Sequence, residues 1–138
     1  MPPVTGVLAD VNIEGHVDYL MALVRAAPWK DLWDELDLVY ATFGEVGLSA
    51  QATDAEIWQR CQDLGYVLIT SNRNRDRPDS LEATIRERNA EDSLPVLTIA
   101  NAERLRASHS YAQRVAESLV DVLIRIETVR GAGRLYLP

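Results

Sequence analysis

The chain has 138 residues, 47% of them hydrophobic, so a single domain over 1–138 with a packed core and no disulfide support is expected. The 14 basic and 21 acidic residues give a formal net charge of −7, which argues against a protein that coats nucleic acid. The lone Cys61 argues against a disulfide framework or a thiolate metal motif, and no apolar run approaches the roughly 18 residues that span a bilayer, so a cytoplasmic location and no membrane contact are expected.

The first predicted strand is the short apolar run 7–9, which ends at a polar turn. From Ile13 onward, apolar side chains recur at helical spacing, and Pro28 ends this predicted helix. Apolar residues within 29–36 predict one or two further helical turns, and the apolar stretch 38–41 predicts a second strand. We therefore expect the order strand, helix, strand in this part of the chain.

The next predicted helix has recognisable signals at both ends. Thr53 and Glu56 form a capping box, in which the two side chains satisfy the first free amides of a helix. The helix is expected to run to about Leu64, with Gly65 at the C′ position. Residues 66–70 then give the clearest buried strand of the chain.

A polar loop over 71–78 follows that strand, and such loops at strand ends commonly carry functional sites. The remaining predicted elements, in chain order, are a short helix that Asp79 and Glu82 cap and that ends near Asn89, a strand over 94–100 followed by Asn101 as an N-cap, a helix whose apolar face covers 111–126, and an edge strand over 134–137.

Strands and helices alternate along the whole chain with short connections. This alternation requires parallel strand pairing and right-handed crossovers, so helices cover both faces of the sheet. The predicted fold class is a three-layer α/β/α sandwich with a mainly parallel sheet. Ligands bind at the carboxyl ends of the strands in such sheets, where the polar clusters 10–12 and 71–74 are expected to meet.

Carboxylates at this edge would suit a hard divalent cation such as Mg²⁺ or Mn²⁺, which prefers oxygen ligands. Asp10 is the best single candidate, because it directly follows the first strand. Asp54 reaches the same edge from the first turn of its helix, and Asp76 supplies a third carboxylate from the loop. A purely structural interpretation of Asp54 also stands, because the helix dipole favours an acidic residue in a first turn.

Cationic and polar side chains near this edge are candidate contacts for a substrate phosphate. Arg73 and Arg75 lie in the densest basic stretch of the sequence, and Asn12 belongs to the first polar cluster. His16 lies one turn into the first helix and is a weaker candidate for a phosphate contact. The alternative is that these arginines lie on a solvated loop and helix face and have no role in binding.

Three segments, 10–12, 53–57 and 67–74, resemble in order and spacing the PIN-like domains of small bacterial proteins. The resemblance covers about residues 5–102. It implies an α/β/α fold and an Mg²⁺- or Mn²⁺-dependent ribonuclease, of the kind that includes toxins of toxin–antitoxin pairs. It also implies a metal site built from Asp10, Asp54 and the segment after Thr70, in which Asn72 is the candidate ligand.

The segment after Thr70 departs from the family pattern. The family usually has an aspartate pair where this chain has Asn72 and Asn74. The loss of two negative charges weakens the affinity of a site for a hard cation. Turn chemistry is the alternative explanation, because asparagine caps turns and tolerates left-handed backbone.

Two classes of function follow from these residues. As an enzyme, the chain would be a metal-dependent endoribonuclease in which Asp10, Asp54, Asn72 and Asp76 form the catalytic site and RNA is the substrate. As a catalytically inactive scaffold, it would act through protein contacts, as a homodimer or with an antitoxin or other protein partner. The candidate contact surfaces for that role are the tryptophan-containing segment 29–36 and the last helix. A receiver-like or flavodoxin-like domain ranks last, because the expected acidic pair and late lysine are missing.

Overall fold

The computed structural model describes residues 2–73 and 80–138. The strands are β1 (Gly6–Ala9), β2 (Val39–Ala41), β3 (Tyr66–Thr70), β4 (Val96–Ile99) and β5 (Arg134–Leu137). The helices are α1 (Glu14–Val24), α2 (Lys30–Leu36), α3 (Asp54–Leu64), α4 (Leu81–Arg88), α5 (Arg104–Ala107) and α6 (His109–Ile124). Short 3-10 turns occupy Val11–Ile13 (η1), Gly44–Val46 (η2) and Ile126–Thr128 (η3).

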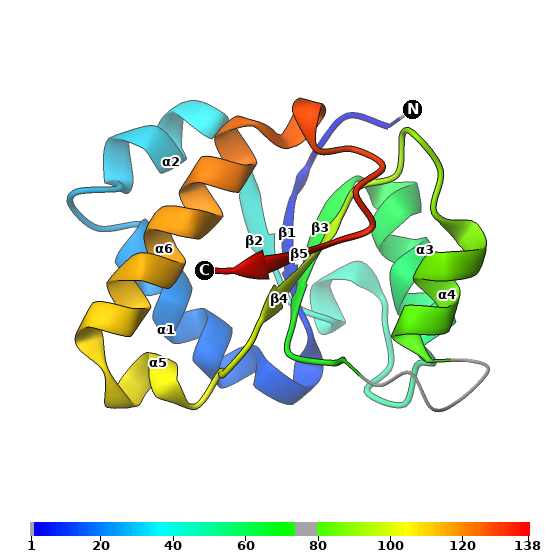
Figure 1. The fold of residues 1–138 in the computed structure, drawn as a ribbon, viewed down its shortest axis with the longest axis horizontal. Helices are drawn as coiled ribbons and strands as arrows, with labels where there is room; N and C mark the ends of the chain where they lie inside the picture. Colours follow the sequence, from blue (N-terminus) through cyan, green and yellow to red (C-terminus); the bar gives the residue numbers. More distant parts are fainter. Residues whose placement is uncertain (1, 74–79) are drawn as a thin grey trace.

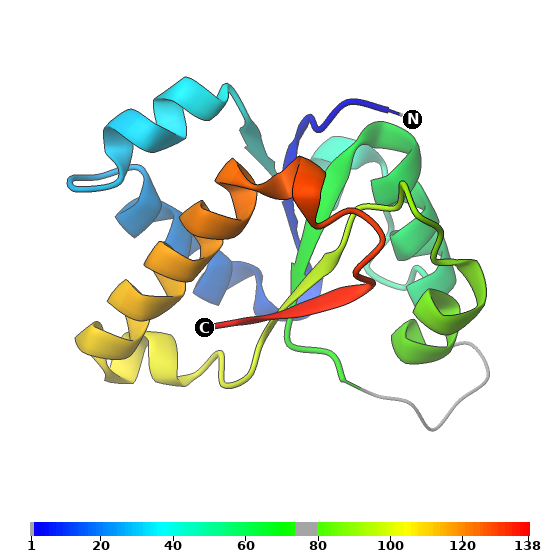
Figure 2. The same cartoon turned by 45° about the horizontal axis from the view of Figure 1, so that its top comes forward.

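The strands form one five-stranded sheet in the order β2-β1-β3-β4-β5, and every pairing is parallel. Figures 1 and 2 show α1, α2, α5 and α6 on one face of the sheet and α3 and α4 on the other. The predicted α/β class and its three layers are confirmed. No helix in the described ranges is long and apolar enough to cross a membrane.

The core has two parts because the central strands are buried on both faces. Alternate strand residues point to opposite faces of a sheet, so a fully covered strand needs apolar side chains at successive positions. Val7 and Ile69 join the larger cluster, under α1 and α6, whereas Leu8 and Leu68 join the smaller one, under α3 and α4. This two-sided burial holds the carboxyl ends of β1 and β3 side by side.

The predicted signals for α3 are confirmed, with one difference at its N-terminus. The Thr53 hydroxyl oxygen accepts a hydrogen bond from the Glu56 amide at 3.1 Å, and Gly65 has the left-handed φ of 81°. The Glu56 carboxylate accepts a hydrogen bond from the Thr53 hydroxyl at 3.2 Å. The predicted return bond from Glu56 to the Thr53 backbone amide is therefore replaced by a contact between side chains.

The predicted start of α4 is corrected. Ser80 is the N-cap, and its hydroxyl accepts the Ala83 amide at 3.1 Å, while Asp79 lies outside the described residues. Glu82 has no capping role, because its carboxylate accepts hydrogen bonds from Arg134 on β5. A short serine side chain three residues before a free amide is sufficient for a cap.

The C-terminal half contains a helix, α5, that the sequence prediction did not separate from the last one. Asn101 was predicted as an N-cap, but the N-cap residue of α5 is Glu103. The Asn101 side-chain oxygen still accepts a hydrogen bond from the Arg104 amide, at 3.3 Å. The last helix begins at His109, with Ser108 as its N-cap. The predicted edge strand is confirmed, because β5 pairs only with β4 within the sheet.

The contact surface predicted for the tryptophan segment is corrected as well. Trp33 is 6% exposed and belongs to the core cluster under α1 and α6. The apolar face of α6 packs into the same cluster, so it is covered by this chain's own residues. Leu32 on α2 and Ile124 on α6 remain as exposed apolar side chains.

Candidate functional site

Asp10 lies at the carboxyl end of β1, and the neighbouring strand β3 holds it there. Its backbone amide donates to the Ile69 carbonyl at 2.9 Å, and the residue is 7% exposed. One carboxylate oxygen accepts the Asn12 amide at 3.3 Å, and the other accepts the Thr70 hydroxyl at 2.6 Å. Buried carboxylates require such donors, which here come from the next turn and from the end of β3.

Asn72 connects Thr70 to Asp54. The Asn72 backbone amide donates to the Thr70 hydroxyl oxygen at 2.9 Å, and its side-chain nitrogen donates to an Asp54 carboxylate oxygen at 3.2 Å. The same Asp54 oxygen accepts the Leu81 amide, at the start of α4, at 2.9 Å. Asp10, Asp54 and Asn72, predicted from three separate segments, are therefore part of one hydrogen-bonded network.

Arg134 is a member of this network that the sequence analysis did not identify. Its guanidinium, on a side chain only 8% exposed, donates to the Asn72 carbonyl at 2.8 Å and to the Thr98 hydroxyl at 2.7 Å. It also forms an ion pair with Glu82 at 3.0 Å. The network, defined as Asp10, Asp54, Thr70, Asn72, Glu82, Thr98 and Arg134, thus contains three carboxylates and one cation.

The negative charge of Asp10 affects the thiol of Cys61 on the neighbouring helix α3. Burial, and to a smaller extent the nearby Asp10 carboxylate, together raise the pKa of the Cys61 thiol to about 12. A thiol with so high a pKa stays protonated at neutral pH. Cys61 is therefore a core residue and has no role as a nucleophile or a thiolate ligand.

The network offers few ligands to the predicted Mg²⁺ or Mn²⁺ ion. Within 2–73 and 80–138, no group of three or more His, Cys, Asp or Glu side chains is arranged to hold a metal. Asp10 and Asp54 supply two carboxylates, and Mg²⁺ commonly binds through one or two carboxylates while its other ligands are water and substrate phosphate. Both are carboxylates of the type that such an ion binds, whereas Asn72 directs its amide nitrogen toward Asp54.

The remaining predicted site residues lie around the network or outside the described residues. Asn12 contributes its backbone amide to Asp10 and is otherwise exposed, and Arg73 is exposed one residue after Asn72. His16 is half-buried in the first turn of α1, and its Nδ1 has no hydrogen-bond partner among the described residues. Three further predicted or discussed residues lie outside the described ranges: Asn74, Arg75 and Asp76.

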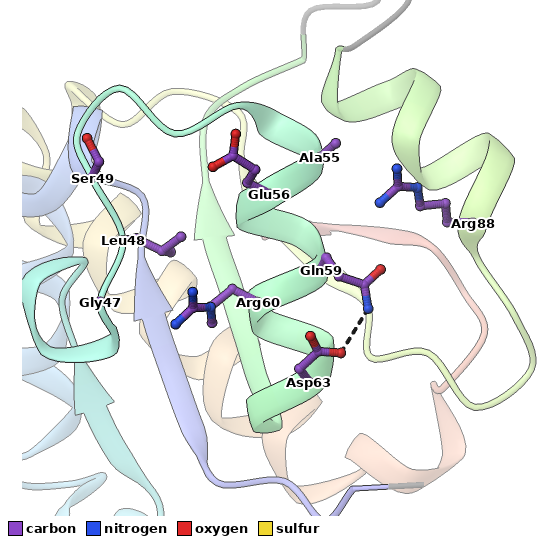
Figure 3. Close-up of a pocket in the computed structure, with 9 residues that line it drawn as sticks. All are labelled: Gly47, Leu48, Ser49, Ala55, Glu56, Gln59, Arg60, Asp63 and Arg88. Carbon is purple, nitrogen blue, oxygen red and sulfur yellow. Dashed lines mark hydrogen bonds between the residues drawn. The ribbon is translucent and has the colours of Figure 1, made fainter.

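A cavity of about 510 Å³ lies on the outer side of α3, between η2 and α4 (Figure 3). Glu56 and Asp63 on α3 are combined there with Arg60, and Arg88 points in from α4. Arg60 donates to the Val46 carbonyl at 2.9 Å, so part of its hydrogen-bonding capacity is already used. With both signs of charge and an open mouth, this cavity selects no particular ligand, and the network at the strand ends remains the candidate site.

Four members of the network were not predicted as site residues: Thr70, Glu82, Thr98 and Arg134. Thr70 carried a usable signal, because it is the last residue of the predicted strand and has a hydroxyl directed along the strand end. Arg134 carried none, because its role depends on which strand pairs with which. Local patterns do not contain that information.

No protein-family model, curated protein or solved structure matches this chain. The resemblance to PIN-like domains therefore stays a prediction from the motifs. The geometry at the ends of β1 and β3 is the evidence on which a function can be proposed.

Proposed function

We propose that this chain is a PIN-like, metal-dependent endoribonuclease. One observation carries the proposal: Asp10 after β1 and Asp54 at the start of α3, far apart in the sequence, belong to one network at the carboxyl edge of the sheet. This edge is where parallel α/β sheets place their ligands. Two carboxylates joined by one hydrogen-bonded network, beside exposed polar groups, support phosphodiester hydrolysis better than a nucleophilic triad or a dinucleotide motif, for which the sequence gives no pattern.

Asp10 and Asp54 would hold the Mg²⁺ or Mn²⁺ ion. The chemistry that the ion supplies when bound is the activation of water for attack on a phosphodiester. The Thr70 hydroxyl and the Asn12 amide donate to Asp10 and fix the orientation of its carboxylate. The Asn72 side chain and the Leu81 amide likewise donate to one carboxylate oxygen of Asp54 and orient it.

RNA is the proposed substrate, and its binding has to overcome the net charge of −7. Arg73 is exposed directly beside Asn72, where its guanidinium would pair with a phosphate next to the scissile bond. A cytoplasmic toxin, held inactive by an antitoxin, is the biological role that fits such an activity.

The test combines metal binding with RNA cleavage. Mn²⁺ is titrated calorimetrically into the full chain, and cleavage of a fluorogenic RNA is measured with Mn²⁺, Mg²⁺ or EDTA. Asp10→Asn and Asp54→Asn are expected to lose metal binding and at least about 100-fold in cleavage rate. Asp121→Asn is the matched control, because Asp121 is an exposed carboxylate of α6 that pairs with Arg125. Cleavage that survives EDTA, or that the control loses equally, would contradict the proposal.

The inactive scaffold is the second candidate, and Arg134 is the observation that favours it. A buried cation already neutralises part of the charge at this edge, and Asn72 stands where the family pattern has an aspartate. In that case the exposed Val39 and Tyr136, on the edge strands β2 and β5, would contribute to contacts with a second copy or a partner protein. Wild-type protein that neither binds Mn²⁺ at millimolar concentration nor cleaves RNA would establish this candidate over the enzyme.

A further inference from the structure

The Arg134 side chain joins three segments of the chain at the carboxyl edge of the sheet. Arg134 is the first residue of β5, which lies at the edge of the sheet beside β4. Figure 1 shows the place of β5 in the fold. The Arg134 guanidinium donates to Glu82 on α4 through Nε at 3.2 Å and Nη2 at 3.0 Å, and through Nη1 to the Thr98 hydroxyl and the Asn72 carbonyl. Only 8% of the side chain is exposed, so these bonds form away from bulk water.

The register of the sheet explains this reach. Arg134 pairs with Val96 on β4, and Thr98 lies two residues further along β4, on the same face of the sheet. The arginine side chain therefore runs along β4 in the strand direction, past Thr98, until it meets Asn72 after β3. Arginine is suited to this position because its planar group presents several donors in a fixed geometry.

Asn72 transmits this constraint to the candidate site. Its carbonyl is held by Arg134, its backbone amide by the Thr70 hydroxyl, and its side chain donates to Asp54. Asp54 in turn accepts the Leu81 amide. Without the guanidinium, the Asn72 carbonyl would lose a charge-assisted hydrogen bond, and its side chain would be less firmly aimed at Asp54.

We propose that Arg134 is a positioning residue for the candidate site, through which the last strand of the chain orients Asn72 and Asp54. The proposal rests on the proposed nuclease function for its catalytic meaning, but the structural coupling can be measured separately. Arg134 does not touch a reacting group. Its effect is expected on the rate of the chemical step and on the order of Asn72, with little effect on the affinity for RNA.

Arg130 provides a matched control within the same chain. Its side chain is 6% exposed, it pairs with Glu127 at 2.6 Å, and it donates to the carbonyls of Asp92 and Pro2. It is thus an equally buried arginine with equivalent bonds, but its partners precede β4 and β1, at the amino edge of the sheet. A general loss of stability affects both variants, whereas a loss of positioning affects only Arg134.

The experiment compares Arg134→Gln, Arg134→Lys and Arg130→Gln in the full-length ¹⁵N-labelled chain. Hydrogen exchange of the Asn72 side-chain amide and of the Leu81 backbone amide is measured by NMR, beside RNA cleavage with Mn²⁺. Arg134→Gln is expected to speed exchange at both groups by about tenfold and to lower kcat by roughly 10- to 100-fold, with KM for RNA within about threefold. Arg134→Lys is expected to give exchange rates and a kcat between those of the wild type and Arg134→Gln, because lysine keeps the positive charge but not the planar set of donors.

Exchange at Asn72 and Leu81 that is unchanged in Arg134→Gln, or raised equally in Arg130→Gln, overturns the proposal. A change confined to KM also overturns it, because that would mean direct contact with RNA. If the wild-type chain has no nuclease activity, the proposed function fails while the exchange data still decide the positioning role. The two failures are therefore distinguishable.

Milder variants keep the test informative if Arg134→Gln does not fold. Thr98→Val removes one acceptor of the guanidinium, and Glu82→Gln removes the charge of its carboxylate partner. Each is expected to raise exchange at Asn72 by about threefold, less than the full loss of the arginine. Unchanged exchange at Asn72 in both folded variants would contradict the proposal.

Discussion

Thr70 illustrates how one hydroxyl organises the candidate site. It is fully buried, donates to Asp10 and accepts the Asn72 amide, so both of its hydrogen-bonding roles are used. A valine of similar shape would leave the buried Asp10 carboxylate and the Asn72 amide with one partner fewer each. Threonine at this position therefore adds a side-chain link between the ends of β1 and β3 to the backbone bond from Asp10 to Ile69.

Cys61 gives a prediction on pH dependence. Its pKa is raised from 9.0 to about 12 in the folded chain, first by burial and then by Asp10. Because the pKa of the thiol is higher in the folded than in the unfolded chain, its contribution to stability is fully present below about pH 9. This contribution is lost as the pH rises from about 9 toward 12. We expect Cys61→Ala to show a shallower fall in the free energy of unfolding over that range in urea denaturation. Equal slopes for the two proteins would contradict this assignment.

At the scale of elements, α3 carries its start and stop signals within its own sequence. Thr53 caps its first turn and Gly65 ends it in a left-handed conformation, so the bounds follow from local chemistry. This places Asp54 at the first helical position, where its carboxylate faces the strand ends. The start of α4 was harder to predict, because Asp79 and Ser80 are both good caps and only packing selects between them.

Gly65→Ala is expected to destabilise the fold by about 1–3 kcal/mol. Gly65 has a φ of 81°, and a Cβ there would lie 2.2 Å from the Pro3 carbonyl oxygen, which is backbone and cannot move aside cheaply. Gly44→Ala is the matched control, because a Cβ at Gly44 has no heavy atom within 4 Å. Urea unfolding of both variants provides the measurement, and equal stabilities would show that the turn at Gly65 accommodates a side chain.

At the scale of the whole molecule, the parallel sheet brings the ends of β1 and β3 to one edge, and the Arg134 side chain reaches this edge from β5. The site therefore depends on the first strand, the middle of the chain and its last strand at once. The edge strand β5 is part of the core, because Leu137 is fully buried and belongs to the cluster under α1 and α6.

Leu137→Ala is therefore expected to cost about 2–5 kcal/mol of stability, as in other buried leucine truncations. Leu64→Ala serves as the comparison, because Leu64 is 42% exposed and its truncation should cost less than about 1 kcal/mol. Chemical denaturation of the two variants measures the difference. Similar losses would mean that β5 is not packed as an integral strand of the sheet.

The sequence by itself determined the features that depend on near neighbours. Strand 66–70, the caps of α3 and the α/β alternation are set by hydrophobic period and turn chemistry within a few residues. The rule that parallel strands end at one edge predicted that the polar segments containing Asp10 and Asn72 would lie close together, and the capping signal placed Asp54 in the first turn of α3. Only the tertiary structure decided that Arg134 joins them, because its reach depends on β5 pairing with β4 in a particular register. That pairing is selected by packing between segments distant in sequence, which no local pattern encodes.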